Sequence, residues 1–159
     1  MTPRDPDREG FVARDGVKVV FSVYENEGPT ILLMPTWSIV HSRHWKAQVP
    51  YLSRHFRVVT FDGRGNGRSD RPRDPGAYSD DEFIADAIAV IDATDSARVV
   101  VAGVSFGGHW SAMLAGLHPE RVEAAILIAA ATSLVSVKHP QRTAYAFDES
   151  LETDEGWAK

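Results

Sequence analysis

The sequence predicts an α/β fold with a mostly parallel sheet that begins with an antiparallel hairpin. Short and wholly apolar runs, such as Thr30 to Met34 and Val122 to Ala129, are typical of strands buried on both faces. Longer segments with apolar residues at helical spacing lie between these runs, as in Ser79 to Asp92. Because strands and helices alternate, we expect crossover connections and therefore parallel strands.

The beginning of the chain predicts an arm followed by a hairpin. We expect residues 1–9 to form a flexible arm, because they contain charged residues and proline but no apolar run. Phe11 to Arg14 and Val17 to Tyr24 then have the composition of two strands. The Asp15-Gly16 pair between them is a two-residue turn of the kind that hairpins prefer.

The rest of the chain predicts strands and helices in alternation. Pro35 should end the next strand, and Pro50 should break a short helix, since proline has no backbone N–H to donate. The segment Ser79-Asp80-Asp81-Glu82 fits a capping box, which makes the helix that begins there the clearest in the sequence. The predicted elements are strand 30–34, helix 43–52, strand 56–61, helix 79–92, strand 98–102, helix 106–117 and strand 122–129.

Composition and charge exclude several classes of protein. The chain has 159 residues, 43% of them hydrophobic and 25% charged, which is enough to bury a core. A formal net charge of -5 provides no basic field for nucleic acid or an anionic membrane, and no apolar run approaches the ~20 residues that span a bilayer. Cysteine is absent, which excludes disulfides and thiol nucleophiles and favours a cytoplasmic location. We predict no metal and no cofactor, because the sequence has neither His-x-x-x-His spacing nor a nucleotide-binding glycine motif.

One segment predicts catalysis. Gly103-Val104-Ser105-Phe106-Gly107 matches the pattern G-x-S-x-G directly after a predicted strand and directly before a predicted helix. A serine on such a sharp turn takes a strained backbone conformation, and small residues two positions to either side let the helix return against the strand. The alternative is a glycine-rich connection in which Ser105 only caps the helix.

Together with two further segments, this motif makes the sequence resemble the α/β-hydrolase family. Residues 62–69, Asp-Gly-Arg-Gly-Asn-Gly-Arg-Ser, are similar to the Asp-x-Arg-Gly-x-Gly-x-Ser loop after the family's fourth strand, and residues 118–122, His-Pro-Glu-Arg-Val, to the approach to its sixth. We expect Arg64 and Arg68 to hold the first of these loops through backbone carbonyls. The resemblance implies an α/β-hydrolase core over residues 10–131 that is truncated before the last strands. Residues 132–159 would then be the start of the lid region or a loose tail.

The resemblance also implies site residues and a reaction. Ser105 would be the nucleophile of a serine hydrolase that acts on an ester or related small-molecule acyl substrate through an acyl-enzyme. The Phe106 N–H would supply one donor of the oxyanion hole. The second donor would come from Met34-Pro35-Thr36-Trp37-Ser38, which departs from the family's usual His-Gly pattern. The proline there has no N–H, so the donor would be the amide of Thr36 or of Trp37.

The base and the acid that a serine nucleophile needs are not identifiable in this chain. In the family they follow the seventh and eighth strands, and no further strand pattern follows residue 129. None of the chain's histidines matches a family position. The alternative to a catalytic role for each is a solvated side chain or one that packs against a helix. The histidines that could substitute are His41, His44, His109 and His139, the last with Asp148 or Glu149 as its acid.

Two functions are therefore open. The first is a serine hydrolase whose base and acid lie elsewhere, and the second is a non-catalytic half-domain or a structural protein that needs a partner chain. Both leave Val122 to Ala129 as an uncovered edge strand, which predicts self-association or pairing with a completing chain. A dinucleotide site at Gly63, Gly65 and Gly67 is disfavoured, because their spacing is not G-x-G-x-x-G.

Overall fold

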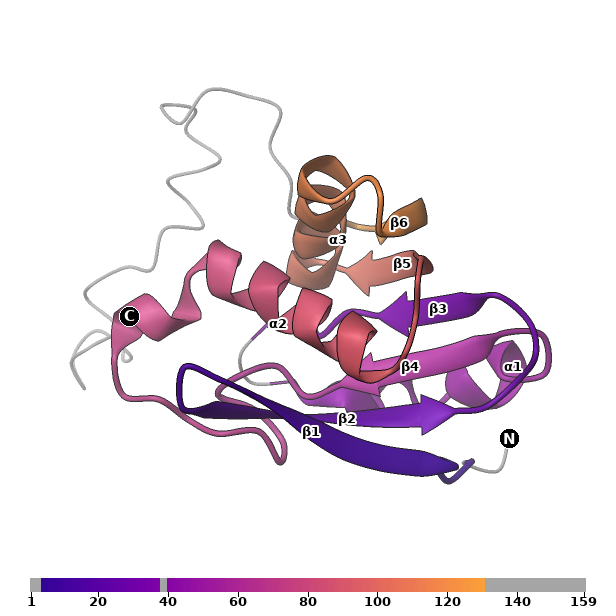
Figure 1. Ribbon diagram of the computed structural model, residues 1–159, viewed down its shortest axis with the longest axis horizontal. Helices are drawn as coiled ribbons and strands as arrows, with labels where there is room; N and C mark the ends of the chain where they lie inside the picture. The colour runs from indigo at the N-terminus through magenta and orange to yellow at the C-terminus, as the bar shows by residue number, and fades with distance from the viewer. Residues whose placement is uncertain (1–3, 38–39, 131–159) are drawn as a thin grey trace, which may run out of the picture.

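A computed structural model describes residues 4–37 and 40–130 as a six-stranded mixed sheet with helices on both faces (Figure 1). The strands are β1 (Arg8–Arg14), β2 (Val17–Tyr24), β3 (Thr30–Leu33), β4 (Arg57–Phe61), β5 (Val99–Val104) and β6 (Val122–Ile128). The helices are η1 (Ser42–Trp45), α1 (Val49–Leu52), η2 (Pro75–Tyr78), α2 (Asp80–Ala93) and α3 (Phe106–Leu117), with η1 and η2 in the 3-10 form. None of these helices is long and apolar enough to cross a membrane. The α/β class predicted from the sequence is confirmed, and the predicted tail, 132–159, lies outside the described residues.

The strands lie in the order β1-β2-β4-β3-β5-β6, antiparallel from β1 to β4 and parallel from β4 to β6. The predicted hairpin is confirmed, and both turn residues, Asp15 and Gly16, have positive φ values of 52° and 78°. β1 begins at Arg8, opposite Val23, so the last two residues of the predicted arm belong to the sheet. An ion pair from Glu9 to Arg68 at 2.7 Å helps to hold this end of the strand.

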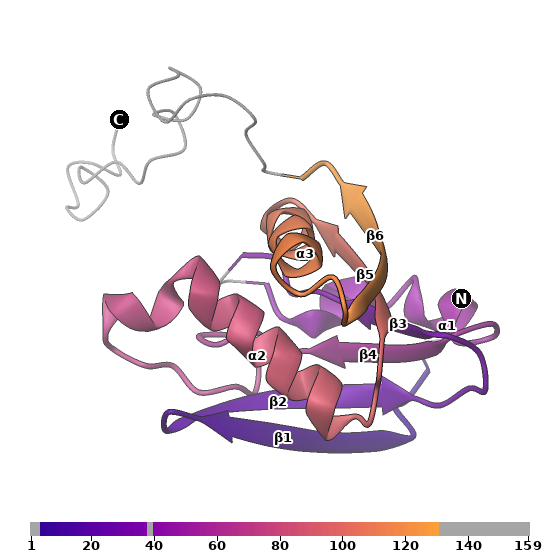
Figure 2. The same ribbon diagram turned by 45° about the horizontal axis from the view of Figure 1, so that its top comes forward.

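The central parallel strands β3 and β5 are almost wholly apolar because both of their faces are covered (Figure 2). Side chains alternate along β3: Leu32 joins the core packed by α2 and α3, whereas Ile31 and Leu33 join the core packed by η1 and α1. Fully burying an aliphatic side chain of this size stabilises a fold by about 1.5–3 kcal/mol. The sheet is therefore a rigid support for the loops at its carboxyl edge.

The helix predicted over residues 43–52 is in fact two short pieces, η1 and α1. The break lies at residues 46–48, so it is near Pro50 as the sequence predicts, although the proline itself lies inside α1. Pro50 occupies the first turn of α1, where a backbone N–H would have no intrahelical acceptor in any case.

α2 begins where the capping box predicts, but the box itself is not formed. The side chain of Ser79 makes no capping bond, although its carbonyl accepts the Glu82 N–H at 3.1 Å. The Glu82 carboxylate instead pairs with Arg14 of β1 and with Arg64 of the loop after β4. The Glu82 carboxylate therefore forms long-range ion pairs and not the local capping bond.

A buried ion-pair network ties the hairpin and the loop after β4 to α2. Asp86 is fully buried, and its two carboxylate oxygens accept bonds from Nε and Nη2 of Arg64, both at 2.7 Å. Arg64 is 2% exposed and also donates to the Ala77 carbonyl, while Nε of Arg14 reaches the same carboxylate at 3.1 Å. Arg64 thus holds its loop chiefly through a carboxylate, and only in part through the backbone carbonyl that the sequence suggests.

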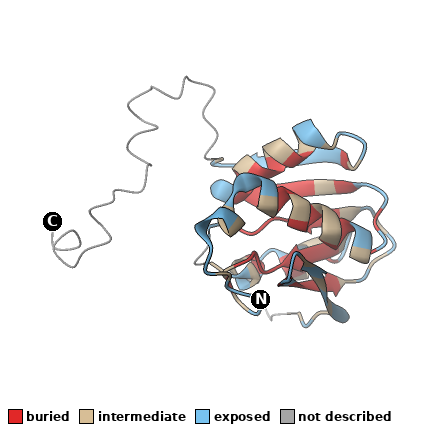
Figure 3. Ribbon diagram, turned by 60° about the vertical axis from the view of Figure 1, so that its left-hand side comes forward, coloured by how far each residue is buried: buried red, intermediate tan, exposed pale blue. Residues whose placement is uncertain are grey.

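β6 forms the edge of the sheet and is its least covered strand (Figure 3). Among the described residues it pairs only with β5, and every position from Glu123 to Ile128 is exposed. Ile126, Leu127 and Ile128 are 46–47% exposed, which is unusual for three consecutive large aliphatic residues. An edge with apolar side chains and unpaired backbone groups is a template for pairing with another chain.

We expect the 159-residue chain to self-associate through β6. Light scattering at micromolar concentration should detect dimers or larger species, because pairing two edges satisfies backbone groups and covers apolar side chains. Ile126→Lys, which puts a charge on the edge, should shift the distribution toward monomer. Tyr51→Lys makes the same kind of change at an exposed position of α1 and should not. A compact monomer that unfolds cooperatively and binds no apolar dye would contradict this expectation.

Candidate active site

Ser105 stands on the sharp turn between β5 and α3. Its φ of 55° and ψ of -120° lie outside the regions that residues with a side chain ordinarily occupy. Backbone strain of this kind costs of order 1–3 kcal/mol and is concentrated at functional sites. Ser105 is exposed at the carboxyl end of β5, the edge of a parallel sheet where ligands bind. Its N–H donates to the Ile128 carbonyl at 3.0 Å, and its carbonyl accepts from the amides of Gly108 and His109.

The glycines of the motif are required by close contacts. A Cβ on Gly103 would lie 2.1 Å from the Gly107 carbonyl oxygen, and a Cβ on Gly107 would lie 2.5 Å from that of Pro35. The first glycine therefore lets α3 fold back against β5, and the second lets the loop after β3 approach α3. Ser105 makes no side-chain capping bond, so the alternative of a mere helix cap is not supported.

The loop after β3 lies against this elbow. The Thr36 hydroxyl donates to the Val104 carbonyl at 2.9 Å, one residue before the serine. The rings of Trp37 and Phe106 have centroids 6.4 Å apart. Phe106 is the first residue of α3, so its amide has no acceptor within the helix and is free to bind a ligand oxygen. The structure thus brings together the segments that carry the three candidate oxyanion donors, whose role stays a prediction.

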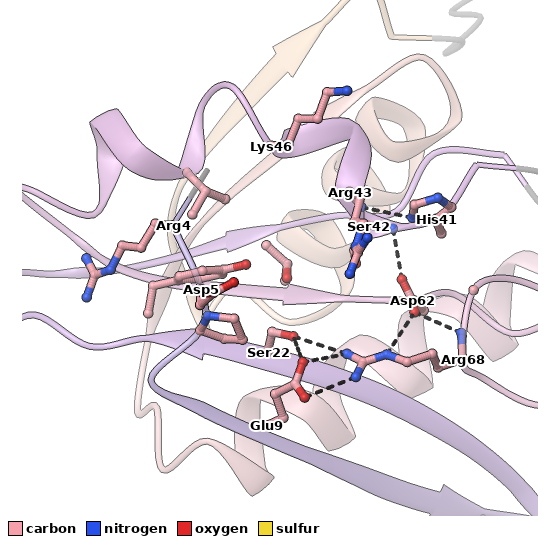
Figure 4. A pocket seen from close by; sticks show the side chains of 15 residues that line it. Arg4, Asp5, Glu9, Ser22, His41, Ser42, Arg43, Lys46, Asp62 and Arg68 are labelled. Atoms are coloured by element: carbon pink, nitrogen blue, oxygen red, sulfur yellow. Dashed lines mark hydrogen bonds and ion pairs between the residues drawn. The ribbon is translucent and has the colours of Figure 1, made fainter. Parts of the chain in front are cut away.

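The loop after β4 is folded around the buried carboxylate of Asp62 (Figure 4). Oδ1 accepts the Ser42 amide at 2.8 Å, and Oδ2 accepts the Arg68 amide at 2.9 Å. Gly67 has a φ of 50°, and a Cβ there would lie 2.2 Å from Oδ2, so only glycine fits. The Arg68 side chain turns to Glu9 and not to backbone carbonyls, which corrects the role expected for it. A cleft of about 520 Å³ opens beside this network.

Asp62 should make stability depend on pH. Burial by itself would raise the pKa of its carboxyl, but the hydrogen bonds from Arg68 and Ser42 outweigh burial and hold the pKa below the ordinary 3.8. A depressed folded pKa gives stability that is present above the unfolded pKa, about 3.9, and is lost as pH falls through the folded pKa. Asp62→Asn replaces an acceptor by an amide NH₂ that faces a donor, so it should cost about 1–3 kcal/mol at neutral pH.

Urea unfolding of both proteins at a series of pH values measures this effect. The stability difference between the unchanged chain and Asp62→Asn should shrink below about pH 4, where the carboxylate is first protonated in the unfolded chain, and should be lost as pH falls through the lower folded pKa. A difference that stays constant over the whole pH range would show that the charge of Asp62 contributes nothing.

No histidine side chain within residues 4–37 and 40–130 hydrogen-bonds to Ser105. Nε2 of His109 lies 3.3 Å from Oδ2 of Asp80, and its Nδ1 is buried without a partner among the described residues. His109 therefore packs on the side of α3 and is not poised as a base.

His41 and His44 serve the structure of η1. Nδ1 of His41 accepts the Arg43 amide at 3.2 Å, and Nδ1 of His44 lies 3.0 Å from the His41 carbonyl. Burial lowers the pKa of His44, whose ring lies against Trp45. The remaining candidates, His139 with Asp148 or Glu149, lie outside the described residues.

Beside the elbow is an aromatic pocket of about 490 Å³ that the sequence indicates only in part. Its lining residues are Trp37, Gly65, Tyr78, Asp80, Phe83, Phe106 and Trp110. Phe83 and Trp110 stack with centroids 4.0 Å apart at 12°, and Phe106 lies 6.0 Å from Trp110. The sequence holds two partial signals: Trp37, in the loop after β3, is a candidate wall of the acyl or leaving-group pocket, and Phe106 and Trp110 stand four residues apart and so share a helix face.

Comparisons with known proteins agree with this geometry. A Caulobacter segnis protein named as a carbamate hydrolase, RutD, is 31% identical over 114 residues, which cover 72% of this chain and 43% of that protein. Epoxide hydrolase B of Mycobacterium tuberculosis is 31% identical over 61% of this chain and 27% of its own length. The crystal structure of the enol-lactonase from Burkholderia xenovorans LB400 has a TM-score of 0.68 and 30% identity, over 74% of this chain and 45% of that one.

The chain thus spans less than half the length of each of these three relatives. A family model for the alpha/beta hydrolase fold matches residues 29–157, a range that includes every element from β3 onward and the serine elbow. On the strength of that match, the sheet order and the elbow, the chain belongs to the α/β-hydrolase fold family, as its motifs implied.

Proposed function

We propose that this chain supplies the nucleophile and oxyanion hole of a serine hydrolase that acts on an ester, lactone or carbamate. The observation that carries the proposal is Ser105, exposed at the carboxyl end of β5 with φ 55° and ψ -120°. In this position the hydroxyl is accessible to a substrate and can approach its carbonyl carbon directly. We also propose a cytoplasmic location, which the cysteine-free composition favours.

The reaction would proceed through an acyl-enzyme. Oγ of Ser105 attacks the carbonyl carbon while a base accepts its proton, and the carbonyl oxygen becomes an oxyanion. The amide of Phe106 and that of Thr36 or Trp37 donate to this oxygen. The bond to the leaving group then breaks, the leaving group takes the proton, and water hydrolyses the ester on Ser105. We assign the base and the acid to residues outside those that the structure describes.

A serine nucleophile favours acyl substrates over epoxides, although an epoxide hydrolase is among the relatives. Attack of Ser105 on an epoxide carbon would form an ether, which water does not cleave under mild conditions. Attack on an acyl group forms an ester, which water does hydrolyse. The lactone and carbamate chemistries named for two other relatives therefore fit this chain better.

Acylation of Ser105 tests the proposal. We expect prolonged incubation with p-nitrophenyl acetate to acetylate Ser105 slowly and to leave an adduct that persists for minutes or longer, because acylation and deacylation both need the base that is missing from the described residues. Mass spectrometry of peptides should locate the adduct. Ser105→Ala should lack it, whereas Ser79→Ala, which removes an exposed hydroxyl at the start of α2, should keep it. An unmodified Ser105, or acetylation spread equally over other residues, would reject Ser105 as the nucleophile.

A further inference from the structure

The aromatic pocket beside Ser105 carries information about the substrate. Its rings come from four separate elements: Trp37 from the loop after β3, Tyr78 from η2, Phe83 from α2, and Phe106 and Trp110 from α3. The centroids of Trp37, Phe106, Trp110 and Phe83 follow one another at 4.0 to 6.4 Å, so these four rings form one continuous apolar wall. Trp37 and Phe106 are 47% and 37% exposed, which leaves the wall open to a ligand.

The carboxylate of Asp80 lines the pocket beside these rings. Oδ1 of Asp80 accepts the indole N–H of Trp110 at 2.8 Å, and Oδ2 lies 3.3 Å from Nε2 of His109. These contacts fix the carboxylate against α3, while half of the Asp80 side chain stays exposed. No lysine or arginine is among the described residues that line the pocket. The pocket therefore presents ring faces and a negative charge to the same ligand.

We infer that this pocket binds planar unsaturated groups that are neutral or cationic, and that Asp80 excludes substrates with a carboxylate on that side; this inference rests on the proposed function. Ring faces attract planar groups by stacking and cations through their quadrupole. A carboxylate held against the wall would be repelled by Asp80 and would lose part of its hydration. Asp80 is thus a specificity-determining residue that takes no part in bond making or breaking.

Three planar ligands of nearly equal shape test the charge preference: benzamidine, benzamide and benzoate. In NMR titrations of the 159-residue chain at neutral pH, benzamidine should bind most tightly and benzoate least. Asp80→Asn keeps an acceptor for the Trp110 N–H and removes the charge. It should lower the ratio of benzamidine affinity to benzoate affinity about five- to tenfold, the size expected for one unit charge at close range in partly exposed surroundings.

Two further variants separate this effect from general charge and from the place of binding. Asp81→Asn removes the same charge from the same turn of α2, but Asp81 lines a different groove, with Ile84 and Ile88, so the affinity ratio should not change. Trp37→Ala should weaken all three ligands to a similar degree if they bind against the ring wall.

The inference is overturned if millimolar ligand does not bind, if Asp80→Asn leaves the affinity ratio unchanged, or if Asp81→Asn lowers it equally. Binding is measured without any reaction, so the result is independent of Ser105. Charge-selective binding without acylation of Ser105 would reject the proposed function and keep the selectivity of the pocket. Acylation of Ser105 without charge-selective binding would keep the proposed function and reject the selectivity of the pocket.

Discussion

Hydrolysis of short p-nitrophenyl esters by the 159-residue chain is expected to be at least about 10⁴ slower than by a complete serine hydrolase, the loss seen when triad members are removed. Ser105 is exposed on its elbow, but His109 is bound to Asp80, and His41 and His44 are used in η1. Among the described residues no base is available to Ser105, and without one the hydroxyl is a weak nucleophile and oxyanion stabilisation alone gives only slow turnover.

Initial rates of the unchanged chain and of Ser105→Ala measure this effect. Turnover in the usual range of ~1 to 10³ per second that Ser105→Ala abolishes would contradict it, and would mean that a histidine reaches Ser105. His41→Ala, His44→Ala and His139→Ala would then identify which one. Slow turnover agrees with the second function considered for this sequence, a chain that is not catalytic until another segment or chain completes it.

Asp86→Ala is expected to destabilise the fold by about 3–5 kcal/mol, because it leaves the guanidinium of Arg64 buried without its main counterion. The loss would also remove one of the two α2 carboxylates that pair with Arg14, so that Glu82 alone would hold this arginine of the hairpin to α2. Since small domains are stable by only about 5–15 kcal/mol, much of the protein should be unfolded at moderate urea concentration. The midpoint of urea unfolding, followed by circular dichroism, measures this change.

Asp92→Ala is the matched control on the same helix. Asp92 also pairs with an arginine, Arg121 at 2.6 Å, but its side chain is 60% exposed. An exposed pair contributes about 0–1 kcal/mol, so this variant should unfold close to the unchanged chain. Equal destabilisation by both substitutions would show that burial of the Asp86 pair does not matter.

Much of the fold follows from local pattern. Asp15-Gly16 specifies its turn by backbone conformation alone, and the apolar runs of β3 and β5 specify strands because both faces of the sheet are covered there. The errors occur where a contact with a residue far away in the sequence determines the local structure. Glu82 satisfies the capping-box pattern, yet it binds arginines that lie far away in the sequence, and no local rule reveals them.

The candidate site was predictable where a motif imposes geometry. Gly103 and Gly107 are needed because the backbone passes close to both, so the motif locates the Ser105 elbow from the sequence alone. The aromatic pocket as a whole was not predictable, because its residues come from two loops and three helices that only the folded sheet brings together. The sequence pattern places Asp80 at a helix start, and its bond to Trp110 spans thirty positions of the chain.

The positions of β3 and β6 in the sheet imply that the two strands open with different free energies in the native state. β3 is bonded on both sides, and Ile31, Leu32 and Leu33 are at most 4% exposed, so its amides should exchange hydrogen only when the whole domain opens. β6 is bonded on one side and exposed, so it can fray locally. The amide of Ser105 donates to the last residue of β6, Ile128, and fraying there would remove one of the three backbone hydrogen bonds that hold the serine. The nucleophile is thus coupled to an exposed edge strand of the sheet, and a segment that covers β6 would also steady Ser105.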